Sequence, residues 1–114
     1  MPVEAIQVVT TTAEKKDAEA VARSVLERRL GACVQISGPI ESHYWWNNRI
    51  ESAHEWTLTI KTRRDLYKAL EKLLLEFHPY DQPEIMATVV AEVSPGYLKW
   101  LTEQVASSHS SSNQ

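Results

Sequence analysis

The chain has 114 residues, a formal net charge of -3 and 43% hydrophobic residues, as expected for one globular domain, which we assign to residues 1–106. Basic residues do not form a run, and Arg28–Arg29 and Arg63–Arg64 are only pairs, which argues against nucleic acid as a partner because phosphate binding depends on clustered Lys and Arg. The sequence shows no membrane span, signal peptide or pair of cysteines, so we expect a cytoplasmic protein without a membrane partner.

The first 31 residues predict a strand followed by a helix. Val3–Thr10 is a β-rich run typical of a buried strand. Thr11 and Glu14 have the spacing of a capping box, so the helix should begin there. Gly31 is expected to end it in the left-handed conformation. The apolar residues between these ends fall on one helix face: Ala18, Val21, Ala22, Val25, Leu26 and Leu30.

A long hairpin is predicted from about Ile40 to Lys61. A second apolar run, Ala32–Ile36, precedes it, and Gly38–Pro39 is expected to bend the chain between the two. Apolar and polar residues alternate with the period of a strand that has two unlike faces. Asn tolerates positive φ, so Asn47–Asn48 can form a two-residue turn. Three of the four tryptophans lie in this stretch, which predicts an interface because aromatic residues often anchor one.

A second helix, a strand and a short helix are predicted next. Thr62 is expected to cap the second helix, with Asp65 in its first turn. The helix should end near Phe77, because Pro79 disfavours helical geometry in the residue before it. Ile85–Val93 is the last strand.

The final helix is expected from Tyr97 to about Ala106. Residues 107–114, SSHSSSNQ, have nothing to bury and are expected to be disordered. The whole order predicts an α+β fold of the ferredoxin-like type, β-α-β-β-α-β with a C-terminal helix. Such a fold does not by itself indicate an activity.

Four phrases of the sequence, taken together, resemble one family. They are Gly31-Ala32-Cys33-Val34-Gln35-Ile36; Ser42-x-Tyr44-x-Trp46 leading through Ile50 and Glu55 to Lys61-Thr62; His78-Pro79-Tyr80 followed by Pro83-Glu84-Ile85; and Tyr97-Leu98-x-Trp100-Leu101. In this order and spacing they resemble the CutA divalent-cation tolerance family. The resemblance implies a homotrimer joined through sheet edges and the long hairpin, a link to tolerance of copper and other divalent cations, and a shape similar to the PII signalling proteins.

Two departures from the family pattern concern the turn and a metal site. The turn usually carries a glycine where this chain has Asn48. Some members have a cysteine and a second histidine that, with the histidine of the HPY phrase, suggest a copper site; here those positions hold Thr10 and Phe77. His78 is the remaining candidate metal ligand. We favour a second interpretation, in which His78 bonds free carbonyls at a helix C-terminus, because one imidazole makes a weak site.

Five further residues match the family phrases and are candidates for binding a ligand. One interpretation places them around an inter-subunit cleft that holds a small anionic or metal-bound ligand. The other has them packing the trimer seam and pairing with backbone or with each other. Both interpretations remain open for Tyr44, Trp46, Lys61, Tyr80 and Glu84.

The remaining candidates have simpler interpretations. Cys33 is expected to be a buried small hydrophobe. His43 and His54 lie on the two hairpin strands and, depending on register, form an exposed metal pair or, as we favour, two solvated side chains. His109 is incidental. The sequence contains no nucleophile–base motif and no Gly-rich phosphate loop, so we do not expect an enzyme.

The resemblance therefore implies a trimeric protein that binds copper or another divalent metal ion and contributes to the response to metal ions. The alternative is a PII-like trimeric sensor or scaffold that binds a small ligand or a partner protein at the subunit clefts.

Overall fold

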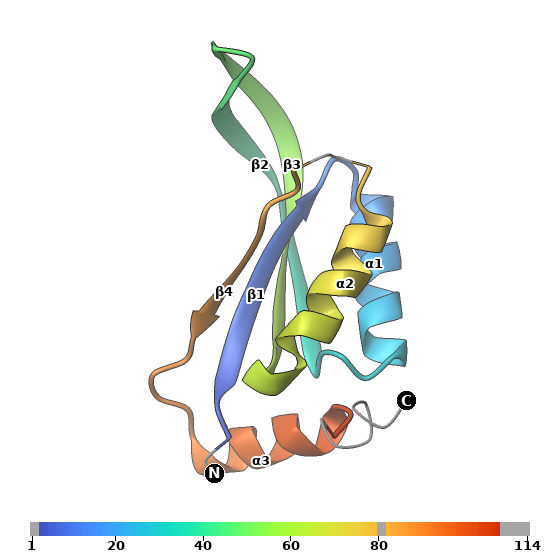
Figure 1. Cartoon of the computed structure of the whole chain (residues 1–114), viewed down its shortest axis with the longest axis vertical. Coiled ribbons are helices and arrows are strands. Elements are labelled where there is room, and N and C mark those ends of the chain that lie inside the picture. The colour runs from blue at the N-terminus through green and yellow to red at the C-terminus, as the bar shows by residue number, and fades with distance from the viewer. Residues whose placement is uncertain (1–2, 80–81, 108–114) are drawn as a thin grey trace.

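A computed structural model describes residues 3–79 and 82–107. The elements are β1 (Ala5–Thr12), α1 (Lys15–Glu27), β2 (Cys33–Trp46), β3 (Arg49–Arg63), a 3-10 turn η1 (Arg64–Leu66), α2 (Tyr67–Phe77), β4 (Ile85–Val89) and α3 (Pro95–Gln104). Each neighbouring pair in the four-stranded sheet, of order β2-β3-β1-β4, is antiparallel. Helices α1 and α2 cover one face, and α3 lies across the end of the sheet away from the hairpin turn (Figure 1). The predicted α+β class and order of elements are confirmed.

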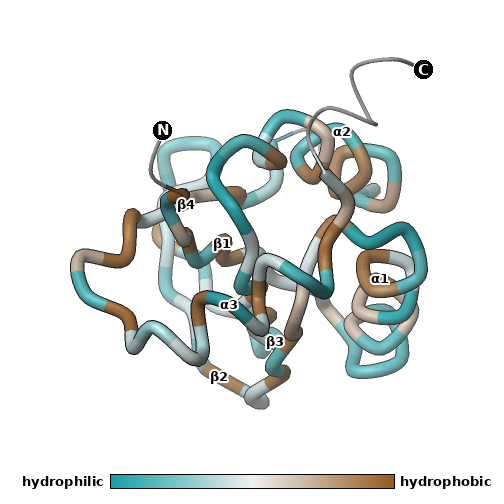
Figure 2. The backbone as a smooth tube through the Cα atoms, turned by 90° about the horizontal axis from the view of Figure 1, so that it is seen from below, coloured by the Kyte–Doolittle hydropathy of each residue, from teal (hydrophilic) through white to brown (hydrophobic). Residues whose placement is uncertain are grey.

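The core lies between the sheet and the two helices α1 and α2, which stand on the same side of the sheet in Figure 2. Val8 pairs with Ile60 and Thr10 with Leu58, so alternate residues of β1 and β3 point to the helices. These four side chains are fully buried. Burying an aliphatic side chain contributes about 1.5–3 kcal/mol, so this layer is a main source of the stability of the fold.

The hairpin turn forms where the sequence places it. Asn47 and Asn48 have φ angles of 52° and 62°, the positive values that a two-residue hairpin turn of the favoured type requires. The expected bend at Gly38–Pro39 does not end a strand: β2 runs on from Cys33 to Trp46, with a register shift between Ser37 and Ile40. The hairpin extends well beyond the helices (Figure 1).

Both predicted helix caps are wrong, because the threonines belong to strands. Thr11 ends up in β1, and α1 begins at Lys15 without a side-chain cap. Thr62 lies in β3, and its buried hydroxyl has no hydrogen-bond partner among the described residues. The carboxylate of Asp65 forms a bidentate ion pair with Arg63, whose Nε and Nη2 donate to it at 3.0 and 3.1 Å.

The end of α1 also differs from the prediction. Arg29, not Gly31, adopts the left-handed conformation, with φ 59°. Leu30 N donates to Val25 O and Arg29 N to Leu26 O, at 3.0 and 3.1 Å, which is the Schellman pattern. Gly31 is needed for another reason: a Cβ there would lie 2.7 Å from Ile60 Cγ2 and 2.8 Å from Val25 Cγ1.

The last strand, in the C-terminal part of the chain, is shorter than predicted. Helix α2 ends at Phe77 as expected, but β4 ends at Val89 instead of Val93. Within α3, Leu101 is buried against the rest of the domain. Most of the predicted disordered tail lies outside the described residues, as do Tyr80 and His109. No helix among the described residues is long and apolar enough to span a membrane.

Candidate functional site

The fold brings His78 to Thr10. His78 follows the last residue of α2, and its backbone N–H donates to Leu74 O at 3.2 Å, which completes the helix end. Its ring atom Nε2 lies 2.8 Å from Oγ1 of the fully buried Thr10. The predicted helix-terminal position of His78 is therefore correct, but its ring lies within hydrogen-bond distance of a β1 hydroxyl, whereas a helix carbonyl was expected. Phe77, at the third position of the suggested copper site, is exposed.

The environment of His78 favours a neutral ring. Burial lowers the pKa of His78 below its usual value of 6.5, and the negative charge of Glu55 opposes this shift only in part. A neutral imidazole is the form that binds metal ions. A threonine hydroxyl can either donate or accept a hydrogen bond, so Thr10 is compatible with either tautomer of His78.

Glu55 belongs to one of the family phrases but was not among the candidate site residues. Its two carboxylate oxygens accept hydrogen bonds from Ser42 Oγ at 2.8 Å and from Thr11 Oγ1 at 3.2 Å. Ser42 and Thr11 lie 13 and 44 residues away in sequence, so no local pattern indicates this cluster. Across the described residues, no three His, Cys, Asp or Glu side chains converge on a point that suits a metal ion.

The described candidate ligand-binding residues do not all meet within one chain. Trp46 pairs with Arg49 at the hairpin turn, whereas Lys61 pairs with Cys33 at the other end of the same ladder. The twelve-residue offset along β3 corresponds to roughly 40 Å at about 3.3 Å per residue. Glu84 is exposed just before β4.

Three of these residues nevertheless share the face of the sheet that α1 and α2 leave uncovered. Leu58 and Ile60 point to the helices, so the odd-numbered positions of β3 point away from them. Lys61 is at an odd-numbered position and lies on this open face. Tyr44 and Trp46 lie there too, because their cross-strand partners are the odd-numbered Glu51 and Arg49. The Nζ atom of Lys61 is 6.0 Å from the centre of the Tyr97 ring. Cys33, opposite Lys61, is half-buried, and the prediction of a buried side chain is only partly met.

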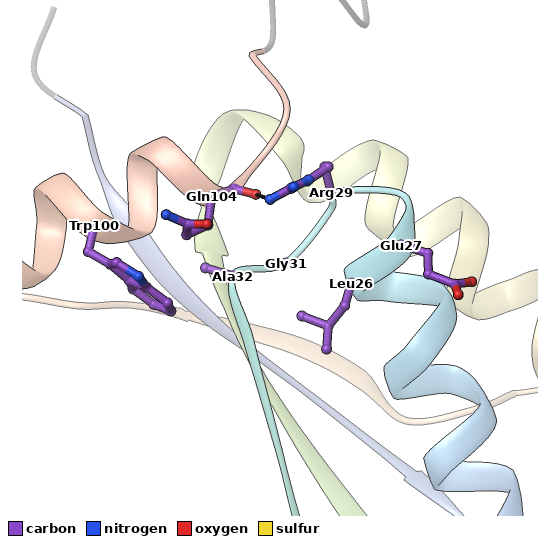
Figure 3. Close-up of a pocket in the computed structure, with 7 residues that line it drawn as sticks. All are labelled: Leu26, Glu27, Arg29, Gly31, Ala32, Trp100 and Gln104. Carbon is purple, nitrogen blue, oxygen red and sulfur yellow. Dashed lines mark hydrogen bonds between the residues drawn. The ribbon is translucent and has the colours of Figure 1, made fainter.

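A groove of about 350 Å³ lies between the end of α1, the start of β2 and α3 (Figure 3). It is lined by Leu26, Glu27, Arg29, Gly31, Ala32, Trp100 and Gln104. Arg29 Nη1 donates to Gln104 O at 2.9 Å, and Ala106 N donates to Arg29 O at 2.8 Å. These bonds fasten α3 to the turn after α1. None of the predicted site residues lines this groove.

Comparison with known proteins agrees with this arrangement. The sequence profile of the family described as CutA1 divalent ion tolerance protein matches residues 6–104. The chain is 39% identical over 99 residues to the divalent-cation tolerance protein CutA of Pyrococcus horikoshii, covering 87% of this chain and 96% of that one. The chain is also 37% identical over 99 residues to protein CutA 1, chloroplastic, of Oryza sativa. The aligned region covers 87% of this chain but only 56% of the rice protein.

A solved structure shows the same fold. The crystal structure of CutA1 from the psychrotrophic bacterium Shewanella sp. SIB1 superposes with a TM-score of 0.89 and 34% identity, over 94% of this chain and all of that one. The family profile covers most of the chain, and the sequence and structural similarities extend over the same elements. The chain therefore belongs to the CutA1 divalent ion tolerance protein family.

Proposed function

We propose that this protein binds divalent metal ions, copper above all, and contributes to metal-ion tolerance as a homotrimer. The observation that carries the proposal is the contact between His78 and Thr10, which joins two of the three positions of the suggested copper site. His78 supplies an imidazole that burial keeps neutral. Relatives whose names include divalent-cation tolerance support the same reading.

One chain alone supplies an incomplete ligand set. Structural zinc sites, for comparison, use four protein ligands and catalytic ones three, whereas Thr10 offers only a neutral hydroxyl beside His78. Glu55 acts on His78 through its charge and already accepts two hydrogen bonds. The proposal therefore requires that water or a neighbouring subunit completes the coordination of an ion at His78.

The homotrimer has its own support in the surface of the chain. Trp45 and Ile50 face each other across the hairpin and are 72% and 69% exposed. Strand β4 is a sheet edge in this chain, and Met86 on it is exposed. Large exposed aromatic residues and an open strand edge favour association with another chain. Sedimentation should give about three times the chain mass of 13.0 kDa; a monomer would refute the trimer.

A second candidate function is the binding of a small ligand at clefts between subunits. It is favoured by the open sheet face that Tyr44, Trp46 and Lys61 share. Glu84, which is exposed just before β4, would join this site, and Tyr80, outside the described residues, belongs to the same proposal. A ligand that binds the folded state alone would raise the melting temperature without metal, which separates this function from metal binding.

We propose further that the protein is not an enzyme and acts in the cytoplasm. The rice relative is named as chloroplastic, so location differs among relatives. Fractionation of the source cells, followed by detection with an antibody, tests this assignment.

The deciding experiment for metal binding is a calorimetric titration with Cu²⁺ of chelator-stripped protein beside His78→Ala. The expected result is one class of tight sites, with a fixed number of ions per trimer, that the unchanged protein has and the variant lacks, whatever binding remains at other residues. If both proteins bind weakly and alike, the copper proposal fails. His109→Ala serves as the matched control, because it removes an imidazole from the terminal segment.

A further inference from the structure

The pairing register of β2 and β3 gathers three residues of metal-binding types, Glu41, His43 and His54, on one face of the hairpin. Glu41 lies directly opposite His54, and His43 lies directly opposite Ser52. Because side chains alternate along a strand, Glu41 and His43 share a face with Ser52 and His54. His43 and His54 are thus diagonal neighbours, whose Cα atoms lie about 7–8 Å apart in an antiparallel pair.

The side chain of Glu41 already orients the ring of His43. Nε2 of His43 lies 3.0 Å from Oε1 of Glu41. A carboxylate can only accept a hydrogen bond, so Nε2 carries the proton and, in the neutral ring, the lone pair resides on Nδ1. Histidines that bind metal ions usually donate their other N–H to a carboxylate in this way, which fixes the tautomer. Glu41 is thus a positioning residue, and Nδ1 of His43 is the donor atom.

We propose that His43 and His54 together bind one transition-metal ion such as Cu²⁺, Zn²⁺ or Ni²⁺ on this face of the hairpin. Both imidazoles are exposed, and the small Ser52 between them leaves room for an ion. A metal–nitrogen bond of about 2.0–2.1 Å allows two diagonal imidazoles to meet at one ion. Imidazole favours these metals, whereas Mg²⁺ and Ca²⁺ prefer oxygen ligands.

The site forms by rotation of exposed side chains. In the part of the chain that the structure describes, no three potential ligands already converge, so the ion has two protein ligands and water at its other positions. Exposed side chains change rotamer readily on the picosecond to nanosecond timescale. The bound ion would join β2 to β3 beyond Trp56, the last residue of β3 that pairs with β1, in the hairpin that Figure 1 shows extending past the helices.

The hairpin site is separate from His78. Thr10, the partner of His78, pairs with Leu58, and His54 lies four residues further along β3 towards the turn. That separation is roughly 13 Å at about 3.3 Å per residue. Either site can therefore bind or fail to bind an ion independently of the other.

Calorimetric titration of the chelator-stripped full chain with Zn²⁺ tests the proposal on His43→Ala, His54→Ala and His78→Ala. Removing even an indirect partner of a metal ligand costs about 10- to 100-fold in affinity, so His43→Ala and His54→Ala should each weaken one site at least about tenfold. The variant that carries both hairpin substitutions should bind Zn²⁺ no more weakly than either single variant. His78→Ala should keep the hairpin site. The proposal is overturned if either hairpin variant binds like the unchanged protein. Loss in His78→Ala alone would support the proposed function and overturn this inference.

Ring-nitrogen NMR gives a second readout that does not depend on affinity. Without metal, His43 should show the tautomer protonated at Nε2, and Glu41→Ala should reduce its population. Zn²⁺ should shift Nδ1 of His43 together with one ring nitrogen of His54, and Mg²⁺ should shift neither. Shifts confined to His78 would contradict the hairpin site.

Discussion

Oγ1 of Thr10 lies 2.8 Å from Nε2 of His78, although 68 positions separate the two residues in sequence. Thr10 is fully buried in the middle of the sheet, and His78 is held in place by the end of α2. The residue at position 10 therefore decides which group the imidazole meets. A hydroxyl gives a neutral hydrogen bond, whereas a thiolate would add a soft ligand for copper beside the imidazole.

Thr10→Cys should convert this contact into a stronger copper site. Thiolate and imidazole together suit copper, so we expect affinity for Cu⁺ to rise by at least about tenfold. Competition against a chromogenic copper chelator under reducing conditions measures the change. The substitution is nearly isosteric and should leave the fold intact, which circular dichroism checks.

The matched control is Thr11→Cys, which adds the same thiol to the opposite face of β1, where Thr11 bonds to Glu55. It should leave copper affinity at His78 unchanged. Equal gains in the two variants would mean that any added thiol binds copper and that His78 is not involved.

The lowered pKa of His78 predicts a dependence of stability on pH. The ring titrates near pH 6.5 in the unfolded chain but at a lower pH in the folded one. As the pH falls below 6.5, the unfolded state therefore binds a proton that the folded state resists, and stability is lost. Urea unfolding should show a free energy that declines from about pH 7.5 to about pH 5.5, and less steeply in His78→Gln. An unchanged slope in His78→Gln would contradict the prediction.

Gly31→Ala should destabilise the domain. Its Cβ would lie 2.7 Å from Ile60 Cγ2 and 2.8 Å from Val25 Cγ1, both on core side chains with no room to move. Overpacking of this kind costs about 1–3 kcal/mol of unfolding free energy, measurable by chemical denaturation. Gly96→Ala is the control, since nothing lies within 4 Å of its Cβ and Ala suits a helix better. Equal effects of the two substitutions would show that the packing around Gly31 adjusts freely.

The sequence predicts local features of this fold better than long-range ones. The turn at Asn47–Asn48 and the end of α2 before Pro79 depend on neighbouring residues, and both are observed. The predicted caps at Thr11 and Thr62 fail because pairing with other strands extends β1 and β3 through them. Local propensity was outweighed there by ladder hydrogen bonds that no short window contains.

The same reasoning explains the outcome for the candidate site. His78 was found through a short motif, but its contact with Thr10 depends on how α2 packs beside β1. Glu55 belongs to a family phrase, but its hydrogen bonds could not be predicted because its partners Ser42 and Thr11 come from two other strands. Whether His43 lies near His54 depends on the pairing register of β2 and β3. The alternation of side chains does not determine that register until the turn residues are fixed.

Asn48→Gly should stabilise the hairpin. Asn48 has φ 62°, a conformation that costs a residue with a Cβ more than it costs glycine. Since Gly is preferred at the second position of this turn, we expect a gain of up to about 1 kcal/mol, partly offset by the greater freedom of glycine in the unfolded chain. Asn48→Ala should lose stability, because Ala lacks the side-chain hydrogen bonds that help Asn to adopt this conformation. Denaturation at one fixed protein concentration measures both, as association would otherwise change the result. Ser52→Gly, on an exposed extended position of β3, should destabilise the protein; a gain there equal to that of Asn48→Gly would show that the turn conformation is not the cause.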